Sequence, residues 1–406
     1  MGGTLDTTAA VPSAFDDIDR DLVGGAPYLL SHFDYLNSSN RPEADRVRAL
    51  VDAFLGRYPE VNRAWLRNRL RSVDDIGHLG AFFELALHHL LIRVGCGAVE
   101  VEPPIQGTRR VPDFLVETPS GDQFYLEATL ATGRSQANAA AQQRLDQAFK
   151  TIDSIASPDF FLSLSTSGMP TGMITGKRLK RELKRWLASL DYDEVSAAWQ
   201  GDSKAVPVFL YEEHAVRFRI PPLPRRRSRG STAPIRSIGG RMLDPIRVQP
   251  QVPIRNAIIG KATRYGDLDL PYIVAVNAMS DYANEEDAID ALVGSLSMSV
   301  RWSEAGYEDE LTRVPDGVWL DGGGPINTRV SAVLSTERLT PWSLGQRRAR
   351  LVVNPWAQKP LPGLDLGIDV LRLQEDDLRR FPGKDFRALF GLPEGWPESQ
   401  VGWSAA

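Results

Sequence analysis

Apolar residues recur at helical spacing in the first part of the chain. Between Pro42 and Arg71 they repeat every three or four positions, and the pair Tyr58-Pro59 interrupts the pattern. This spacing predicts two helices, because it gives each helix one apolar face and because a proline breaks a helix just before itself. We therefore expect residues 1–71 to form a helical amino-terminal lobe.

A more strongly apolar segment follows at residues 76–95. The polar residues from Ser72 to Asp75 can cap the start of a helix there, and Gly95 can end it. Apolar side chains lie on nearly every side of this helix. The pattern therefore predicts a largely buried helix.

The next part of the chain favours strands. Three strand candidates are followed by a helical stretch and a fourth strand, and they cover residues 98–105, 109–118, 122–131, 137–155 and 159–166 in that order. Pro119 to Asp122 have the composition of a tight turn, so the second and third strands should form a hairpin. A helix that crosses over to a later strand predicts an α/β fold, with a mixed central sheet flanked by helices and a core at residues 72–166.

Residues 167–406 have a looser pattern, which we interpret as an α+β extension that could continue the core sheet. Its expected elements are a basic amphipathic helix, a hairpin, a surface loop, a helix and buried strand pair, and two late strands, at residues 176–190, 205–223, 221–234, 254–279, 328–335 and 348–356.

The hairpin brings two carboxylates together. In a strand pair that turns about Gly121, Asp113 and Glu127 fall opposite each other. Both stand in apolar surroundings, where two adjacent carboxylates would repel unless a cation joined them. A hard divalent ion such as Mg²⁺ prefers oxygen ligands of this kind. Thr129 lies two residues after Glu127, so its hydroxyl should point to the same face.

Glu84 is a third acid, in the middle of the apolar helix at residues 76–95. An unpaired carboxylate is costly to bury at such a position. Glu84 should therefore either form an ion pair with an arginine, for example Arg93 or Arg110, or reach the metal site.

These residues together resemble the PD-(D/E)XK nuclease superfamily, which includes many restriction enzymes and repair nucleases. The resemblance consists of a helix glutamate (Glu84), the pair Pro112-Asp113 on one strand and Glu127-Ala128-Thr129 on the next. It implies a restriction-endonuclease-like fold and Mg²⁺- or Mn²⁺-dependent hydrolysis of phosphodiester bonds. It also implies that Asp113, Glu127 and Glu84 surround the metal.

Thr129 departs from the family pattern, because a lysine that helps to activate the attacking water stands there in the family. Four residues could substitute for this lysine. They are Gln142 and Gln143 in the following helix, Arg110 before the aspartate, and Lys261 in a distant helix.

The composition is typical of a globular protein, and the chain has 406 residues. The sequence also indicates the cellular compartment. The single cysteine excludes an internal disulfide, and Cys96 is better explained as a buried thiol than as a nucleophile. The amino terminus has neither the basic nor the apolar region of a signal peptide, and no segment is long enough to span a membrane. We expect a cytoplasmic protein.

The formal net charge of -5 argues against indiscriminate coating of nucleic acid. Positive charge is nevertheless concentrated in four runs, at residues 67–71, 177–185, 225–229 and 346–350. A groove lined by some of these runs could hold a polyanion, although each single run is more simply explained as a solvated surface.

Two functions of different classes follow from these observations. The first is a metal-dependent endonuclease acting on DNA, with a possible role in restriction or defence and a possible homodimer as its active form. The second is a catalytically inactive module on the same fold that binds nucleic acid or another protein. RNA is an alternative substrate for the enzyme, although no segment is diagnostic of RNA binding.

Overall fold

The computed structural model describes residues 12–25, 30–132, 136–202, 205–225, 238–243, 250–280, 283–303, 306–361, 363–374 and 377–398. The chain divides into two compact units. We call them the large unit (Met1–Gly24, Ser31–Gly133 and Gln249–Ala406) and the small unit (Gly25–Leu30 and Arg134–Val248). The small unit is thus inserted in the sequence of the large one.

Four helices open the large unit, and the predicted helices are confirmed. They are α1 (His32–Ser38), α2 (Pro42–Arg57), α3 (Glu60–Leu70) and α4 (Asp75–Arg93). Pro42 stands in the first turn of α2, where its missing N–H costs nothing. Asp74 caps α4 by accepting a hydrogen bond of 3.0 Å from the backbone N–H of Gly77. The strongly apolar α4 is buried over most of its length, as its pattern predicts.

A three-stranded antiparallel meander follows α4. Its strands are β1 (Ala98–Val101), β2 (Phe114–Glu117) and β3 (Gln123–Ala131). Gly121 adopts a positive φ of 85° in the turn between β2 and β3, a conformation that costs glycine little. The pairing of Phe114 with Leu126 confirms the predicted hairpin register.

The meander forms one side of an eight-stranded sheet with the order β1-β2-β3-β9-β14-β15-β16-β17. The added strands are β9 (Tyr272–Ala278), β14 (Ala332–Glu337), β15 (Arg350–Val353), β16 (Asp369–Gln374) and β17 (Asp377–Phe381). β9 runs parallel to both β3 and β14, while β14 and β15 are antiparallel. The predicted α/β class, with a mixed central sheet and flanking helices, is confirmed.

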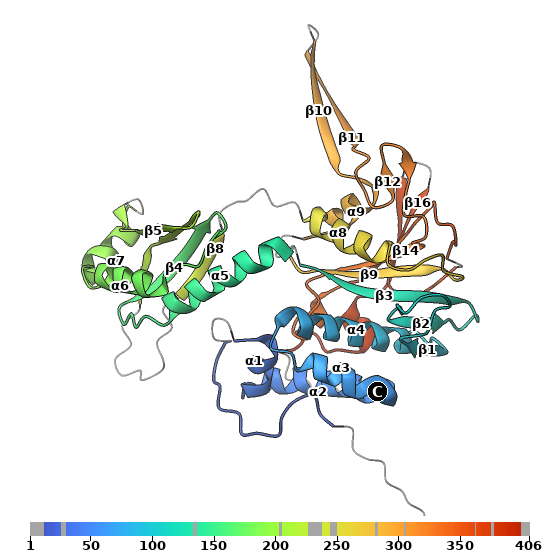
Figure 1. Ribbon diagram of the computed structural model, residues 1–406, viewed down its shortest axis with the longest axis horizontal. Helices are drawn as coiled ribbons and strands as arrows, with labels where there is room; N and C mark the ends of the chain where they lie inside the picture. Colours follow the sequence, from blue (N-terminus) through green and yellow to red (C-terminus); the bar gives the residue numbers. More distant parts are fainter. Residues whose placement is uncertain are drawn as a thin grey trace, which may run out of the picture. The chain divides into compact units, whose positions relative to one another are not determined.

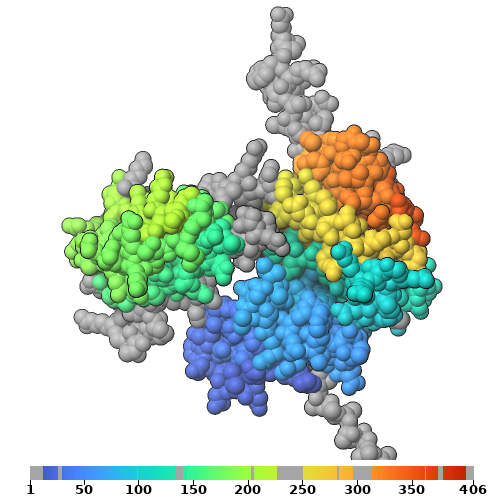
Figure 2. Space-filling view, viewed as in Figure 1, coloured from blue at the N-terminus to red at the C-terminus, as the bar shows by residue number. Residues whose placement is uncertain are grey.

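Helices cover both faces of this sheet (Figure 1). On one face Phe124 and Leu126 of β3 pack in a core with Phe82 of α4. On the other face Tyr125 shares a core with Ile258 of α8 (Gln251–Ala262) and with residues of α9 (Glu285–Val293). The space-filling view shows the light-blue residues of α4 and the yellow residues of α8 on the two sides of β3 (Figure 2).

One expectation for the core is wrong. Residues 137–155 and 159–166 were expected to supply its closing helix and strand, but α5 (Gln136–Asp153) and β4 (Phe160–Ser167) belong to the small unit. The helix and strand that complete the core come later in the chain, as α8 and β9. The burial patterns give the reason. All seven residues of β9 are buried, as in a central strand, whereas β4 alternates between buried and at least partly exposed residues.

The structure therefore groups the chain differently from the expected segments 72–166 and 167–406. The small unit has its own five-stranded sheet, in which β4 pairs with β6, β7 and β8, and β5 pairs with β6. Its further elements are α6 (Gly176–Leu187), α7 (Tyr192–Gln200), β5 (Phe209–Glu213), β6 (Val216–Ile220), β7 (Pro222–Pro224) and β8 (Ile238–Leu243). The predicted hairpin at residues 205–223 is confirmed by β5 and β6.

Within the described residues of the small unit, helices cover one face of the small sheet. Apolar residues of α5, α6 and the sheet form a separate core, which includes Phe149, Leu183 and Phe218. The opposite face carries Ser165, Arg217 and Arg219, which are partly or fully exposed. This alternation is typical of a sheet with one buried and one open side.

The remaining elements decorate the large unit. They are a long hairpin of β10 (Leu296–Ser303) and β11 (Gly306–Arg313), a short one of β12 (Leu320–Asp321) and β13 (Gly324–Pro325), the 3-10 helix η2 (Leu344–Gln346) and α10 (Phe386–Phe390). The β10–β11 hairpin extends away from the large sheet (Figure 1). Among the described residues, no helix combines the length and apolarity that crossing a membrane requires.

Candidate metal centre

Asp113 lies directly before β2, at the position that faces Glu127 when the hairpin register is continued by one pair. Its carboxylate accepts a hydrogen bond of 2.6 Å from the backbone N–H of Ala128. Burial, together with the nearby charges of Glu127 and Glu84, raises the pKa of Asp113 to about 7, although the hydrogen bond from Ala128 and the charge of Lys261 oppose the rise. The charges of Glu127 and Glu84 thus both act on Asp113.

Glu127 points to the sheet face that α8 covers. Its side chain is only 1% exposed, so its charge needs strong partners. Lys261 contacts Oε1 at 2.5 Å and Arg264 contacts the same oxygen at 3.1 Å, while the Tyr265 hydroxyl donates to Oε2 at 2.6 Å. Both oxygens of this buried carboxylate are therefore engaged by donors from α8 and the residues that follow it.

Glu84 comes from α4, on the other side of β3. Its carboxylate accepts a hydrogen bond of 2.6 Å from the Tyr58 hydroxyl and forms an ion pair with Arg69. Burial raises the pKa of Glu84, while Arg69 and Tyr58 oppose the rise. The structure thus shows the ion-pair alternative for Glu84, with Arg69 in place of the expected Arg93 or Arg110.

The predicted site residues line one cavity of about 660 Å³ in the large unit. Glu84, Asp113, Glu127 and Thr129 all contribute to its wall. The wall also holds a fourth acid, Glu102, and five basic residues: Arg69, Arg109, Arg110, Lys261 and Arg264. A cavity that combines clustered acids with so many cations suits an anionic substrate next to a bound cation.

Among the described residues of the large unit, Lys261 is the expected lysine substitute that contacts Glu127. Lys261 contacts it directly, whereas Arg110 lines the cavity and donates to the carbonyl of Arg264 at 3.0 Å. Gln143 is exposed on α5 in the small unit, and the side chain of Gln142 lies outside the described residues.

Sequence reasoning did not find Arg264 and Tyr265 as partners of Glu127. A signal was present, because both lie three or four positions after Lys261, and such residues share one side of a helix. Tyr58 and Arg69 were missed as partners of Glu84. No spacing rule links them to α4, since they belong to other segments of the chain.

Of the three acids, Asp113 best fits a hard divalent cation, because partners engage both oxygens of Glu127 and both oxygens of Glu84. Within the described part of the chain, one oxygen of Asp113 bonds to Ala128 and the other accepts no hydrogen bond. A cation there would relieve the repulsion that raises the pKa of Asp113. The described residues contain no group of three or more acids, histidines or cysteines gathered at metal-binding range. Glu84, held by Tyr58 and Arg69, supplies no such third group.

No family model, no curated protein and no solved structure matches this chain. The function must therefore be inferred from the chemistry of the cavity and from the order of the elements that build it.

Proposed function

We propose that the chain is a Mg²⁺- or Mn²⁺-dependent nuclease that hydrolyses phosphodiester bonds in DNA. The observation that carries the proposal is the grouping of Asp113, Glu127 and Lys261 at one cavity lined by basic side chains. These residues come from the position before β2, from β3 and from α8. These are the two acids and the lysine that the PD-(D/E)XK resemblance requires, with the lysine supplied from α8.

The order of elements supports a restriction-endonuclease-like core. α4, β1, β2, β3, α8 and β9 follow one another as helix, three antiparallel strands, helix and a strand parallel to β3. The small unit stands between β3 and α8 in the sequence, as an insertion into this order. A role in restriction or defence against foreign DNA is an extension of the same proposal.

The contacts of each site residue suggest its role in the proposed reaction. Asp113 and Glu127 hold the divalent cation, which when bound neutralises charge that develops on the phosphate oxygens. Lys261 orients the attacking water from its position beside Glu127. The Thr129 hydroxyl faces the same cavity and can hold a water, but it cannot supply positive charge. Glu84 fixes Arg69 at the cavity wall and acts as a positioning residue.

Plasmid cleavage with Mg²⁺ tests the metal assignment. Asp113→Asn and Glu127→Gln should each lower the rate by more than about 100-fold, because even a residue that only supports a metal ligand costs about 10- to 100-fold. Glu117→Gln is the matched control, since it neutralises an acid on the same strand pair outside the cavity. Circular dichroism checks that each variant folds. Cleavage at the normal rate in either site variant would disprove the assignment.

An inactive binding module is the second candidate. Thr129 at the lysine position and the engagement of both Glu127 oxygens favour it. Under this alternative the wild-type protein binds nucleic acid but cleaves neither DNA nor RNA with Mg²⁺ or Mn²⁺. The cleavage assay with both nucleic acids and both metals therefore separates the two candidates.

A further inference from the structure

The four basic runs of the sequence differ in the contacts that their side chains form in the structure. Arginines of the runs at residues 67–71 and 346–350 are taken up by ion pairs within the large unit: Arg69–Glu84, Arg71–Asp16, Arg348–Asp369 and Arg350–Glu337. Of the run at residues 225–229 only Arg225 is described, and it stacks on Phe161 at 3.8 Å. The run at residues 177–185 lies on α6 of the small unit.

The basic side chains of α6 are mostly solvent-exposed and free. Lys177, Arg181, Lys184 and Arg185 are exposed, and among the described residues none of them forms an ion pair. The helix has one acid, Glu182, which pairs with Arg178 at 2.9 Å. This is a concentrated positive surface on a chain whose net charge is -5.

The charge pattern of α6 is unfavourable for the isolated helix. Lys177 and Arg181, and then Arg181 and Arg185, are like charges four positions apart, and like charges at this spacing destabilise a helix. The first turn holds no acid, although the helix dipole favours negative charge there. A bound polyanion would relieve both costs, so the pattern favours an anionic partner.

A membrane surface fits α6 poorly as that partner. Helices that lie in a bilayer interface bury their apolar side among the lipids. In α6 the apolar residues Leu179 and Leu183 are both 0% exposed and belong to the core of the small unit. Among the described residues, the fully exposed side chains of α6 are all charged.

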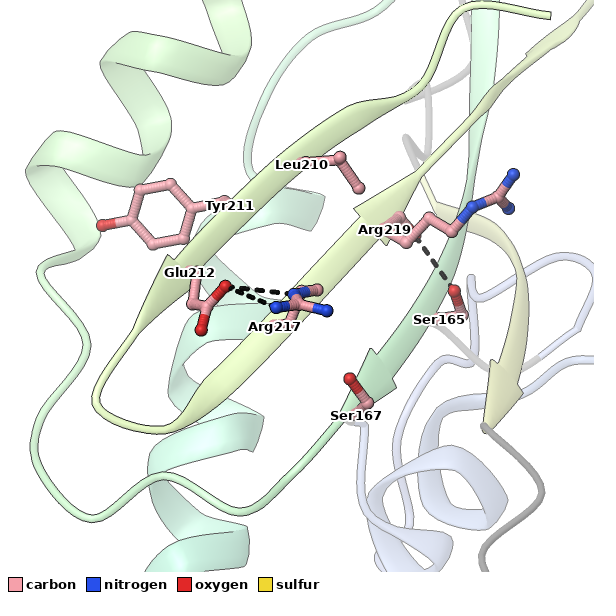
Figure 3. A pocket seen from close by; sticks show the side chains of 7 residues that line it. All are labelled: Ser165, Ser167, Leu210, Tyr211, Glu212, Arg217 and Arg219. Atoms are coloured by element: carbon pink, nitrogen blue, oxygen red, sulfur yellow. Dashed lines mark hydrogen bonds and ion pairs between the residues drawn. The ribbon is translucent and has the colours of Figure 1, made fainter.

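The open face of the small sheet is a weaker candidate for the same partner. A hollow there is lined by Ser165, Leu210, Arg217 and Arg219, among others (Figure 3). Glu212 accepts two hydrogen bonds from Arg217, at 3.0 and 2.9 Å. It therefore neutralises one of the two arginines that line the hollow. α6 lies against the other face of this sheet, which makes the two surfaces separately testable.

We propose that the exposed basic side of α6 binds the phosphate backbone of duplex DNA. The inference rests on the proposed function, because a nuclease for DNA needs a surface that holds the duplex irrespective of its sequence. The twelve residues of α6 extend over roughly 18 Å, along which duplex DNA presents one charge per about 1.7 Å. Lys177, Arg181, Lys184 and Arg185 would make the phosphate contacts.

Fluorescence anisotropy with a labelled DNA duplex tests this proposal in the full-length chain, with EDTA present to prevent cleavage. Arg181→Gln/Arg185→Gln removes two charges from α6, and Arg217→Gln/Arg219→Gln removes two from the open sheet face. Loss of two phosphate contacts should weaken binding by about tenfold or more at low salt and reduce the slope of log affinity against log salt by about 2. The sheet-face variant should bind like the wild type.

Several outcomes would overturn the proposal. They are equal losses in both variants, unchanged binding by the α6 variant, and wild-type binding to phosphatidylserine vesicles or single-stranded RNA in preference to duplex DNA. Parallel cleavage assays separate this inference from the proposed function. Cleavage by the wild type with α6-independent binding overturns the inference alone, whereas α6-dependent binding without cleavage overturns only the hydrolytic function. Circular dichroism confirms that each variant is folded.

Discussion

Asp113 shows how one residue couples the site to stability. Its pKa is raised to about 7 by burial and by the charges of Glu127 and Glu84. The unfolded chain holds an aspartate with a pKa near 3.9, so between these values the folded state binds more protons than the unfolded state. The contribution of Asp113 to stability is therefore complete below about pH 4 and is lost as the pH rises to about 7.

Asp113→Asn should remove the loss of stability at high pH, because asparagine keeps an oxygen that accepts from the Ala128 N–H and carries no charge. We expect its melting temperature to exceed that of the wild type by a few degrees at pH 8, with a smaller difference at pH 5. Thermal unfolding at the two pH values measures the effect, with Glu117→Gln as the control. Mg²⁺ should stabilise the wild type and not Asp113→Asn. A wild type that is more stable than the variant at pH 8 without metal would contradict the repulsion.

Substitutions at Lys261 and Thr129 test which residue takes the role of the lysine that the PD-(D/E)XK resemblance implies. Lys261→Met should lower single-turnover cleavage by about 100-fold, a typical effect of losing a group that moves or orients a proton. Thr129→Val should have a modest effect. Thr129→Lys in the Lys261→Met background should restore part of the rate, since residue 129 lines the same cavity from the strand of Glu127.

Rescue is the discriminating result of this exchange. A lysine with a merely structural role at α8 would not be replaced by one on β3. If Thr129→Lys gave no recovery in a folded double variant, Lys261 would only neutralise Glu127, and its assigned part in orienting water would have to be withdrawn.

At the scale of elements, local sequence patterns predicted individual helices and the hairpin register. They did not predict which elements distant in the sequence pack together. The apolar pattern of α4 predicted a buried helix, and even its histidines His88 and His89 are buried, with burial lowering their pKa values to about 4 and about 3. The register of β2 and β3 was also predictable, because a tight turn fixes which residues face each other. Asp113 and Glu127 were found through this register.

The sequence did not reveal which helix and strand complete the core. Two pairs have suitable patterns, α5 with β4 and α8 with β9, and the nearer one was expected. The two pairs differ in their surroundings in the fold. β9 has a neighbouring strand on each edge and is buried on both faces, which depends on segments distant in the sequence. For the same reason the partners of Glu84 were not predictable, whereas Lys261 was one of four alternatives and its spacing to Arg264 and Tyr265 was a signal for the other partners of Glu127.

At the scale of the whole molecule, the two units are separable in their cores and sheets. No strand of the small sheet pairs with a strand of the large sheet in the described residues, and each unit has apolar cores of its own. The chain leaves the large unit after β3, which carries Glu127, and returns before α8, which carries Lys261. Folding and metal binding should therefore reside in the large unit, and much of the DNA affinity in the small one.

Replacement of residues 134–248 by a glycine-serine linker of about 15 residues tests this division, since a chain of that length can span up to roughly 50 Å. The gap is shorter, because β3 extends only about 13 Å beyond Glu127, α8 begins about 15 Å before Lys261, and Lys261 contacts Glu127. The shortened chain should unfold cooperatively and keep its stabilisation by Mg²⁺, but bind duplex DNA at least about tenfold more weakly because α6 is absent. Calorimetry and anisotropy measure the two properties. A shortened chain that does not fold, or that binds DNA as tightly as the full chain, would contradict the assignment of these roles.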